Sequence, residues 1–457
     1  MILKELKKYL QKDTRIIKQV QLCGNMKILK PVALDLENLI QDDRKYTWRK
    51  NHQGKLGLTS DFVKGKIIKK NIPKMYYFIS MLIIAYENDY NRCLVSGFDE
   101  YVKVHFGTLE DVGINRKNLK QIISFLKNYK IIDFTTDSRM TNVPNQYYYV
   151  NTKYYNLLEP YDDKYEIYDI DLEFKKTKMN KKLKIIFNEQ PYLRHQYDRQ
   201  KEMLFDFNSA EKQVNTSFYG NLVDMIQFIS YYNMFKRIYN KNFYFVVSDK
   251  CNRVFTVINN MPKFLRKYIV DKNNVPMREL DFSNFNVMLL YKILKEYIDN
   301  NEVSDKVKFE FNRYISDIKD DFYLKIVEYY AKGGYDISRD LAKEIVLIHW
   351  INAKQDCYNQ DFKIMKKLFP ELTKIMTKLK GDSRHSYLSF YNDIMKRESE
   401  LVNKIIYSRI MNELPSAVVY TIFDGIIVED NFTSQIQKIM MEEGKKYIGH
   451  EMKVKIK

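Results

Sequence analysis

The stretch Val418–Val428 reads VVYTIFDGIIV, an apolar segment broken once by Asp424 and the glycine after it. Two apolar runs around an Asp-Gly pair are typical of a β-hairpin that carries the acid at its turn. A second apolar strand is predicted at Met277–Phe282 (MRELDF), with Asp281 near its C-terminal end and a helical run over Val287–Tyr297 after it. One acid in a hairpin turn is ordinary turn chemistry, but two acids on two buried strands indicate a shared site.

The two acids have the chemistry of a metal site. Phosphoryl transfer from a nucleoside triphosphate uses two divalent ions roughly 3.5–4 Å apart, one for the attacking 3′-hydroxyl and one for the triphosphate. Mg²⁺ keeps water and substrate oxygens in most of its coordination positions, so few protein ligands suffice. We therefore expect Asp281 and Asp424 to be catalytic residues and ligands of two Mg²⁺ ions, with Mn²⁺ as the alternative metal. Their carboxylates should then lie within roughly 4–8 Å of each other.

Between the two acids lies a segment with two basic residues at helical spacing, GGYDISRDLAK at residues 333–343. Ser338 is a suitable N-cap, and Arg339 and Lys343 stand at i and i+4, so they share one face of the helix that follows. On spacing alone, a solvated basic face is the simpler interpretation. The functional alternative is that both cations bind the same triphosphate, which would offset their mutual repulsion.

The order of these motifs resembles that of the family-A nucleic-acid polymerases, which comprise DNA polymerase I and the single-subunit phage and mitochondrial RNA polymerases. The resemblance covers roughly residues 216–457. The segment DFSNFN at 281–286 is similar to motif A, RDLAK at 339–343 to motif B of the fingers, and FDG at 423–425 to motif C. In the last of these, Phe423 replaces the usual His of motif C.

Weaker similarities surround these motifs. NRVF at 252–255 resembles the family segment that touches the minor groove of the primer–template duplex, and RES at 397–399 lies where family members carry template contacts. The resemblance therefore implies nucleic-acid binding by Arg253, Arg397 and Glu398.

The resemblance also implies how the nucleotide is bound. Arg339 and Lys343 would neutralise the triphosphate, and Lys343 would protonate the leaving pyrophosphate. Motif B lacks its usual Tyr-Gly, which leaves Trp350 as the candidate for stacking on the new base pair. Asn286 occupies the steric-gate position, where DNA polymerase I has Glu. We expect it either to contact the 2′ position of the incoming sugar or to cap a helix that begins at Val287.

The fold expected from this resemblance is a helix-rich α+β chain with right-hand polymerase architecture. Residues 246–457 would hold the palm, with its small antiparallel sheet, and the helical fingers, and residues 156–245 a connector and thumb helices. The reaction would be attack of a 3′-hydroxyl on a nucleoside triphosphate, directed by a primed nucleic-acid template. A DNA polymerase in phage, plasmid or mobile-element replication is favoured, and an RNA polymerase or primase on the same fold is the alternative.

Residues 1–155 are expected to form a separate N-terminal region, with a winged-helix-like unit that binds nucleic acid at about 66–155. A helix over Arg116–Tyr129 places its apolar residues on one face. A strand at Ile131–Thr135, a polar turn and a return strand at Gln146–Asn151 would follow it. Helix followed by hairpin is the order of a winged helix.

The basic residues of this region carry the DNA-binding hypothesis. A short helix is predicted at Asp99–Phe106, and Asn115 is a good N-cap for the helix after it. In the winged-helix interpretation Arg116, Lys117 and Lys120 would face DNA. The alternative is an ordinary small α/β module with a solvated lysine face.

The composition agrees with a polyanion-binding protein of the cytoplasm. The chain has 457 residues, 45% of them hydrophobic, and a formal net charge of +18, which favours association with nucleic acid. Its four cysteines are far apart, which argues against a disulfide framework or zinc site. The most apolar run, Met75–Tyr86 (MYYFISMLIIAY), is too short for a bilayer and predicts a buried helix, so no membrane partner is expected.

One rival interpretation is a replication initiator without catalytic activity, which would leave Asp281 and Asp424 without a role. A proofreading exonuclease is not expected. The Asp-x-Glu pattern at residues 35–37 and the Tyr-x₃-Asp pattern at 165–169 have the form of exonuclease motifs, but both are common by chance. The sequence leaves protein partners open.

Overall fold

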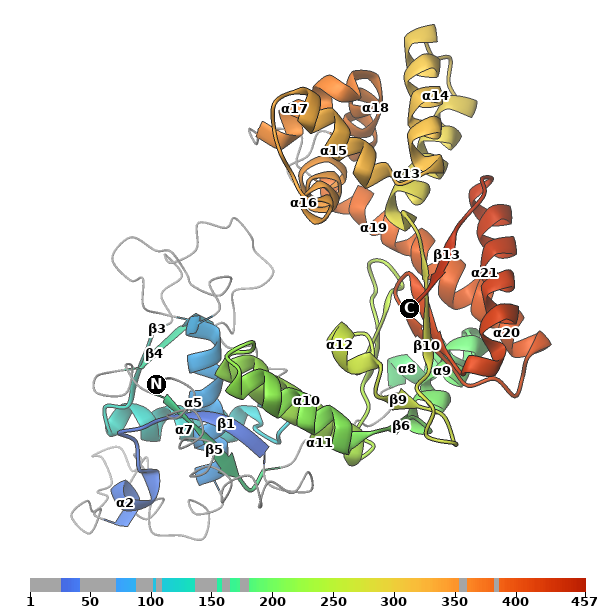
Figure 1. The fold of residues 1–457 in the computed structure, drawn as a ribbon. Helices are drawn as coiled ribbons and strands as arrows, with labels where there is room; N and C mark the ends of the chain where they lie inside the picture. Colours follow the sequence, from blue (N-terminus) through green and yellow to red (C-terminus); the bar gives the residue numbers. More distant parts are fainter. Residues whose placement is uncertain are drawn as a thin grey trace, which may run out of the picture. The chain divides into compact units, whose positions relative to one another are not determined.

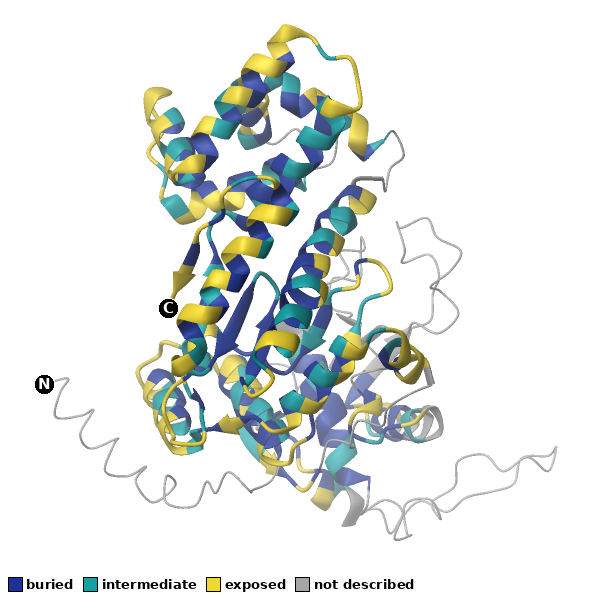
Figure 2. Ribbon diagram, turned by 90° about the vertical axis from the view of Figure 1, so that its right-hand side faces the viewer, coloured by how far each residue is buried: buried dark blue, intermediate teal, exposed yellow. Residues whose placement is uncertain are grey.

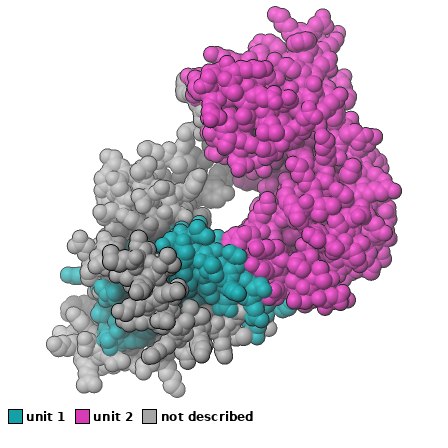
Figure 3. Space-filling view, viewed as in Figure 1, with its two compact units in different colours: residues 1–177, 207–242 teal, residues 178–206, 243–457 magenta. Residues whose placement is uncertain are grey.

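The computed structural model describes residues 26–41, 71–87, 102–103, 109–135, 154–157, 165–172, 181–352, 360–381 and 386–457. The chain divides into two compact units (Figure 3), unit 1 with residues 1–177 and 207–242 and unit 2 with residues 178–206 and 243–457. Helices dominate both, and each contains small antiparallel sheets, so the chain is a helix-rich α+β protein. These units have other boundaries than the predicted regions 1–155, 156–245 and 246–457, which stay a prediction.

Unit 1 contains the following described elements (Figure 1): β1 (Met26–Pro31), α2 (Leu36–Gln41), α5 (Ile72–Glu87), β2 (Val102–Lys103), α7 (Arg116–Asn128), β3 (Ile132–Thr135), β4 (Tyr154–Leu157), β5 (Tyr165–Ile170), α10 (Phe207–Tyr219) and α11 (Met225–Tyr239). Strand β1 pairs antiparallel with β5, and α5 and α11 pack against it. The predicted buried helix over Met75–Tyr86 is confirmed as α5, whose tyrosines and aliphatic residues form much of this core.

The acids of the suspected exonuclease patterns make structural contacts in unit 1. Asp169 stands opposite Lys27 and accepts a hydrogen bond from its ammonium at 3.0 Å. Asp35 accepts from the backbone N–H of Asn38 at 2.9 Å, as a helix-capping acid does. Glu37 accepts from the Tyr76 hydroxyl at 2.6 Å.

A three-stranded antiparallel sheet in unit 1 has the order β2-β4-β3. Asn115 caps α7 by accepting from the N–H of Asn118 at 2.9 Å, as predicted, and the predicted strand at Ile131–Thr135 is confirmed as β3. The predicted helix at Asp99–Phe106 is wrong, because residues 102–103 are strand β2. Their partner β4 lies far along the chain, so this edge pairing has no local signal. The predicted return strand at Gln146–Asn151 lies outside the described residues.

Unit 2 contains the following described elements: α8 (Lys181–Glu189), α9 (Pro191–Lys201), β6 (Leu204–Phe205), β7 (Phe245–Val247), β8 (Val254–Thr256), α12 (Lys263–Arg266), β9 (Ile269–Val270), β10 (Arg278–Phe282), α13 (Phe285–Asp299), α14 (Asp305–Lys319), α15 (Phe322–Lys332), α16 (Arg339–Glu344), the π-helix η3 (Ile345–Ile351), α17 (Gln360–Leu368), α18 (Pro370–Lys380), α19 (Ser386–Ser399), the π-helix η4 (Glu400–Ile406), α20 (Tyr407–Glu413), β11 (Val419–Ile422), β12 (Gly425–Val428), the 3₁₀ turn η5 (Asp430–Phe432), α21 (Thr433–Ile448) and β13 (Val454–Ile456).

The centre of unit 2 is a four-stranded antiparallel sheet with the order β11-β12-β10-β13. Every residue of β11 and β12 is buried, and Figure 2 shows such buried strands between helices that expose only their outer faces. Helix α21 packs against β10 and β13, and α9 packs against β11. The apolar run of Val418–Val428 therefore forms the middle of a covered sheet, as its composition predicts.

Helices α14–α18 form a separate group beyond one end of this sheet (Figure 1). Their shared core is aromatic: Phe322, Trp350 and Phe369 stack with ring centroids 5.2–6.4 Å apart, and Tyr314 meets all three edge-on. Helix α19 and η4 lead from this group back to β11. Within the described residues, no helix is both long and apolar enough to cross a bilayer.

Candidate active site

The two acids found in the sequence lie side by side at one end of the four-stranded sheet. Asp281 of β10 stands opposite Gly425 of β12, and the N–H of Phe282 donates to the carbonyl of Asp424 at 3.3 Å. A Cβ on Gly425 would lie 2.6 Å from the carbonyl oxygen of Leu280. The strands approach this closely only because residue 425 is a glycine, and the approach brings Asp424 next to Asp281.

The turn that presents Asp424 is strained. Phe423 and Asp424 connect β11 to β12, and Phe423 has φ 43°, in a region that bulky side chains rarely occupy. A conformation of this kind costs on the order of 1–3 kcal/mol. Contacts from the β7–β8 hairpin hold it in place: the guanidinium carbon of Arg253 lies 4.0 Å from the centre of the Phe423 ring, and Phe255 meets that ring edge-on at 5.9 Å.

The electrostatic surroundings of Asp424 disfavour its ionised form. Burial and, as a smaller cause, the neighbouring Asp281 carboxylate raise the pKa of its carboxyl to about 6. Lys343 and Lys457 act in the opposite direction but do not restore the ordinary pKa. An added cation would stabilise the ionised forms of these two carboxylates.

The two basic residues of α16 lie in the same neighbourhood. Ser338 caps this helix by accepting from the N–H of Leu341 at 3.1 Å, as predicted. Lys343 is exposed and close enough to Asp424 to lower its pKa. Sequence spacing therefore identified a cation that the fold brings to the acid pair.

Arg339 contacts Asp321 and Tyr323 at the start of α15. Its Nε donates to Asp321 at 2.8 Å, and its guanidinium carbon lies 5.3 Å from the centre of the Tyr323 ring. Burial raises the pKa of the Tyr323 hydroxyl, with a smaller opposing effect of Arg339 and a further increase from Asp424. The buried hydroxyl thus lies within electrostatic range of both Arg339 and Asp424.

A third basic residue, Lys457, was missed in the sequence and contacts Asp281 directly. The ammonium of Lys457 binds the Asp281 carboxylate and donates to Glu279 at 3.2 Å. Arg266 donates to the other oxygen of Glu279 at 3.3 Å. The only local signal was the alternation of Glu279 and Asp281, which puts both acids on one face of β10.

Arg253 and Glu398 bind each other. The guanidinium makes two bonds to the carboxylate, at 2.8 and 3.1 Å, and only 2% of the Glu398 side chain is exposed. Burial raises the pKa of Glu398 to about 7, although Arg253 lowers it. This corrects the expectation that Glu398 contacts nucleic acid, because its carboxylate is enclosed. For Arg253, which stays beside Phe423 and Asp424, nucleic-acid binding stays a prediction.

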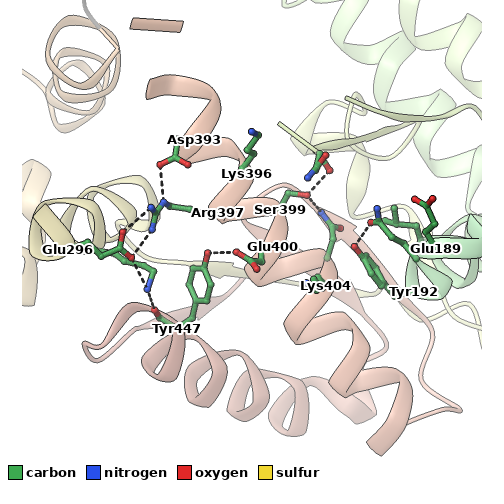
Figure 4. Close-up of a pocket in the computed structure, with 15 residues that line it drawn as sticks. Glu189, Tyr192, Glu296, Asp393, Lys396, Arg397, Ser399, Glu400, Lys404 and Tyr447 are labelled. Atoms are coloured by element: carbon green, nitrogen blue, oxygen red, sulfur yellow. Dashed lines mark hydrogen bonds and ion pairs between the residues drawn. The ribbon is translucent and has the colours of Figure 1, made fainter. Parts of the chain in front are cut away.

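Arg397 lies on another side of α19, because adjacent helical residues point about 100° apart. Its guanidinium donates to Asp393 at 3.0 Å and to Glu296 at 2.9 Å. These residues line a polar pocket of about 800 Å³ (Figure 4). Nucleic-acid binding by Arg397 stays a prediction.

Trp350 is a core residue and not a surface for stacking a base. Its side chain is fully buried, its Nε1 donates to the Thr373 hydroxyl at 2.9 Å, and its faces meet Phe322 and Phe369. The reason is the π-helix η3, in which the chain turns less per residue than in an α-helix. The direction of the Trp350 side chain, counted from Lys343 with α-helical spacing, was therefore predicted wrongly.

Asn286 is the second residue of α13, which begins at Phe285 with Asn284 as N-cap. The proposal that Asn286 caps a helix starting at Val287 is therefore wrong. Asn286 is half-buried and its side chain makes no hydrogen bond within the described part of the chain, which leaves its role as a gate a prediction.

The remaining predicted contacts belong to unit 1. Arg116, Lys117 and Lys120 lie in α7, but their side chains are outside the described part of the structure. Among the described residues of the whole chain, no group of three or more His, Cys, Asp or Glu side chains is arranged for a metal ion. The acid pair is thus a site of two carboxylates.

No protein-family model and no curated protein matches this chain. Among solved structures, the POL domain of Pol1 from M. smegmatis, in complex with DNA primer-template and dNTP, is weakly similar. The TM-score is 0.26, the sequence identity is 8%, and the match covers 54% of each chain, so this chain spans about half the length of that structure. A resemblance at this level does not establish a shared fold.

Proposed function

We propose that this chain is a template-directed nucleotidyltransferase that extends a 3′-hydroxyl with nucleoside triphosphates by two-metal catalysis, most simply as a DNA polymerase. One observation carries the proposal. Asp281 and Asp424, far apart in the sequence, meet on neighbouring strands, and a cation from a different helix, Lys343, lies within electrostatic range of them.

The acid pair fits a site for two Mg²⁺ or Mn²⁺ ions. Both ligands are hard oxygens, and a divalent cation would stabilise the ionised form of Asp424, whose pKa is raised first by burial and then by the Asp281 carboxylate. Such ions supply activation of the 3′-hydroxyl and stabilisation of the leaving pyrophosphate. Asp281 and Asp424 would hold them, and few further protein ligands are needed because Mg²⁺ retains water and substrate oxygens.

Arg339 and Lys343 would bind the triphosphate. Lys343 is exposed, so its ammonium can neutralise a phosphate and give a proton to the departing pyrophosphate. Arg339 has only one bond to Asp321 in this structure, and a guanidinium has further donors for phosphate oxygens. The strained Phe423 and the Arg253 that packs on it would lie beside the primer end.

In a right-hand architecture, the four-stranded sheet would be the palm and helices α14–α18 the fingers. The proposed thumb helices are divided between the compact units, α8 and α9 in unit 2 and α10 and α11 in unit 1. In unit 1, α7 is followed by β3, which pairs with β4, and β2 completes the sheet. This element order supports the proposal of a winged helix. We propose that this element binds nucleic acid through Arg116, Lys117 and Lys120, consistent with the net charge of +18.

The test is primer extension on primed DNA and RNA templates, each with deoxynucleotides and ribonucleotides. We expect Mg²⁺-dependent extension that is strongest for DNA templates and deoxynucleotides. Preferred use of ribonucleotides would identify an RNA polymerase or primase on the same site. Salt-sensitive DNA binding without extension under any of the four conditions would refute the proposal and favour a replication initiator.

A further inference from the structure

Strand β13 brings a lysine onto the proposed metal site. It pairs antiparallel with β10, with Asp281 opposite Lys455 and Leu280 opposite Ile456. The next residue, Lys457, continues the ladder, because its N–H donates to the carbonyl of Glu279 at 2.8 Å. Its side chain therefore lies on the face of the sheet that carries Glu279 and Asp281.

The ammonium of Lys457 bridges these two acids. It binds a carboxylate oxygen of Asp281 and lies 3.2 Å from Oε1 of Glu279. Arg266 already neutralises Glu279 from the other side, at 3.3 Å. The Lys457 ammonium is therefore the closest counter-charge to Asp281, a residue whose neighbour Asp424 is also negative.

Lys455 on the same strand shows that this contact is specific. It is the direct cross-strand neighbour of Asp281, exposed and equally charged. Within the described residues it forms no ion pair with Asp281, whereas Lys457 does. The two lysines differ in contact with the acid and not in formal charge.

We propose that Lys457 is a positioning residue that fixes the Asp281 carboxylate when no metal is bound and competes with the divalent cation for it. The ammonium and a metal ion would both bind the Asp281 carboxylate, and two cations at one carboxylate repel each other. Metal binding must therefore displace Lys457 to Glu279 alone or to solvent, which lowers the affinity of the site. This inference rests on the proposed function, because it requires Asp281 to bind the metal.

Binding of Mn²⁺ to the full chain, without nucleotide or nucleic acid, tests the competition. Free Mn²⁺ is measured by electron paramagnetic resonance for the wild-type protein and for Lys457→Gln, Lys455→Gln, Lys457→Arg and Asp424→Asn. We expect Lys457→Gln to lower the Kd for Mn²⁺ by about tenfold and Lys455→Gln by less than about threefold, because only the first removes a contacting charge. Lys457→Arg should bind Mn²⁺ nearly as the wild type does, because it restores a cation at the same place.

The outcomes separate this inference from the proposed function. If Asp424→Asn abolishes Mn²⁺ binding but Lys457→Gln leaves the Kd unchanged or raises it, the competition is refuted and the proposed metal site stands. Equal tightening in Lys457→Gln and Lys455→Gln would also refute it, because the effect would then come from net charge. Absence of Mn²⁺ binding in every variant, with thermal unfolding showing folded protein, would overturn both.

Discussion

Two carboxylates near the turn of the β11–β12 hairpin face groups of opposite charge: one faces a cation and the other an anion. Glu398 faces one guanidinium with two bonds and has almost no exposed surface. Asp424 faces another carboxylate, and within the described residues it has no ion pair of its own, because Lys457 binds Asp281 instead. Burial raises the pKa of both, but only Glu398 has an internal partner of opposite charge in contact. Glu398 and its guanidinium partner belong to the scaffold, whereas the two acids Asp281 and Asp424 have one contacting cation, Lys457, between them and can accept another.

The largest expected effect is on catalysis and comes from Asp281 and Asp424. Asp424→Asn or Asp281→Asn should reduce nucleotide incorporation by about a thousandfold or more, because metal-held charge stabilisation worth several kcal/mol is lost. Single-turnover primer extension measures the rate, and the affinity for primed duplex should remain near the wild-type value. Asp430→Asn is the matched control, since it neutralises an exposed acid of η5 that pairs with Arg278 at 2.7 Å. Incorporation retained in both site variants would place the metal ligands elsewhere.

The next effect is on stability and comes from the paired acid. Arg253→Met should lower the free energy of unfolding by about 3–5 kcal/mol, because it leaves Glu398 buried without its partner. Denaturant unfolding measures the loss, and Arg253→Met combined with Glu398→Leu should recover much of it. Arg397→Met is the control: its partners Glu296 and Asp393 are 43% and 47% exposed, so about 1 kcal/mol is expected. Equal losses in the two single variants would contradict the distinction between a buried and an exposed ion pair.

A pH titration of stability separates the two acids further. Asp424 has its pKa raised from 3.8 to about 6 by burial and by Asp281, so the folded state binds its proton more tightly than the unfolded state. The associated stability is fully present below about pH 4 and is lost as pH rises through about 6. In metal-free protein we expect Asp424→Asn to become more stable than the wild type by about 2–3 kcal/mol between these pH values. Added Mg²⁺ should remove this difference at neutral pH, and a difference independent of pH would contradict the charge explanation.

The smallest expected effect concerns the choice of sugar. Asn286 is half-buried in the first turn of α13, and its amide makes no hydrogen bond within the described residues. If the amide contacts the 2′ position of the incoming nucleotide, Asn286→Ala should change the ratio of ribonucleotide to deoxynucleotide efficiency several-fold, on the scale of one lost hydrogen bond. Asn284→Ala, which changes the observed N-cap of the same helix, is the control variant. A ratio unchanged by Asn286→Ala would exclude a gating role.

Some of the errors in the sequence analysis have one physical origin. Trp350 was misplaced because η3 is a π-helix, so a side chain several residues beyond Lys343 does not have the phase of an α-helix. Glu398 and Arg397 were treated alike because they are adjacent, although one is enclosed by Arg253 and the other faces a polar pocket. In each case the role depends on where a side chain points, which spacing alone does not determine.

The sequence by itself determined the elements whose signals are local. Alternation, capping residues and an Asp-Gly pair within apolar runs predict the hairpin with Asp424 at its turn, the strand that carries Asp281 and the capped start of α16. Only the tertiary structure decided which charges meet. The order β11-β12-β10-β13 joins segments far apart in the chain, and it alone places Lys457 on Asp281. Strand pairing and burial arise from contacts between distant segments, and such contacts leave no pattern within any one of them.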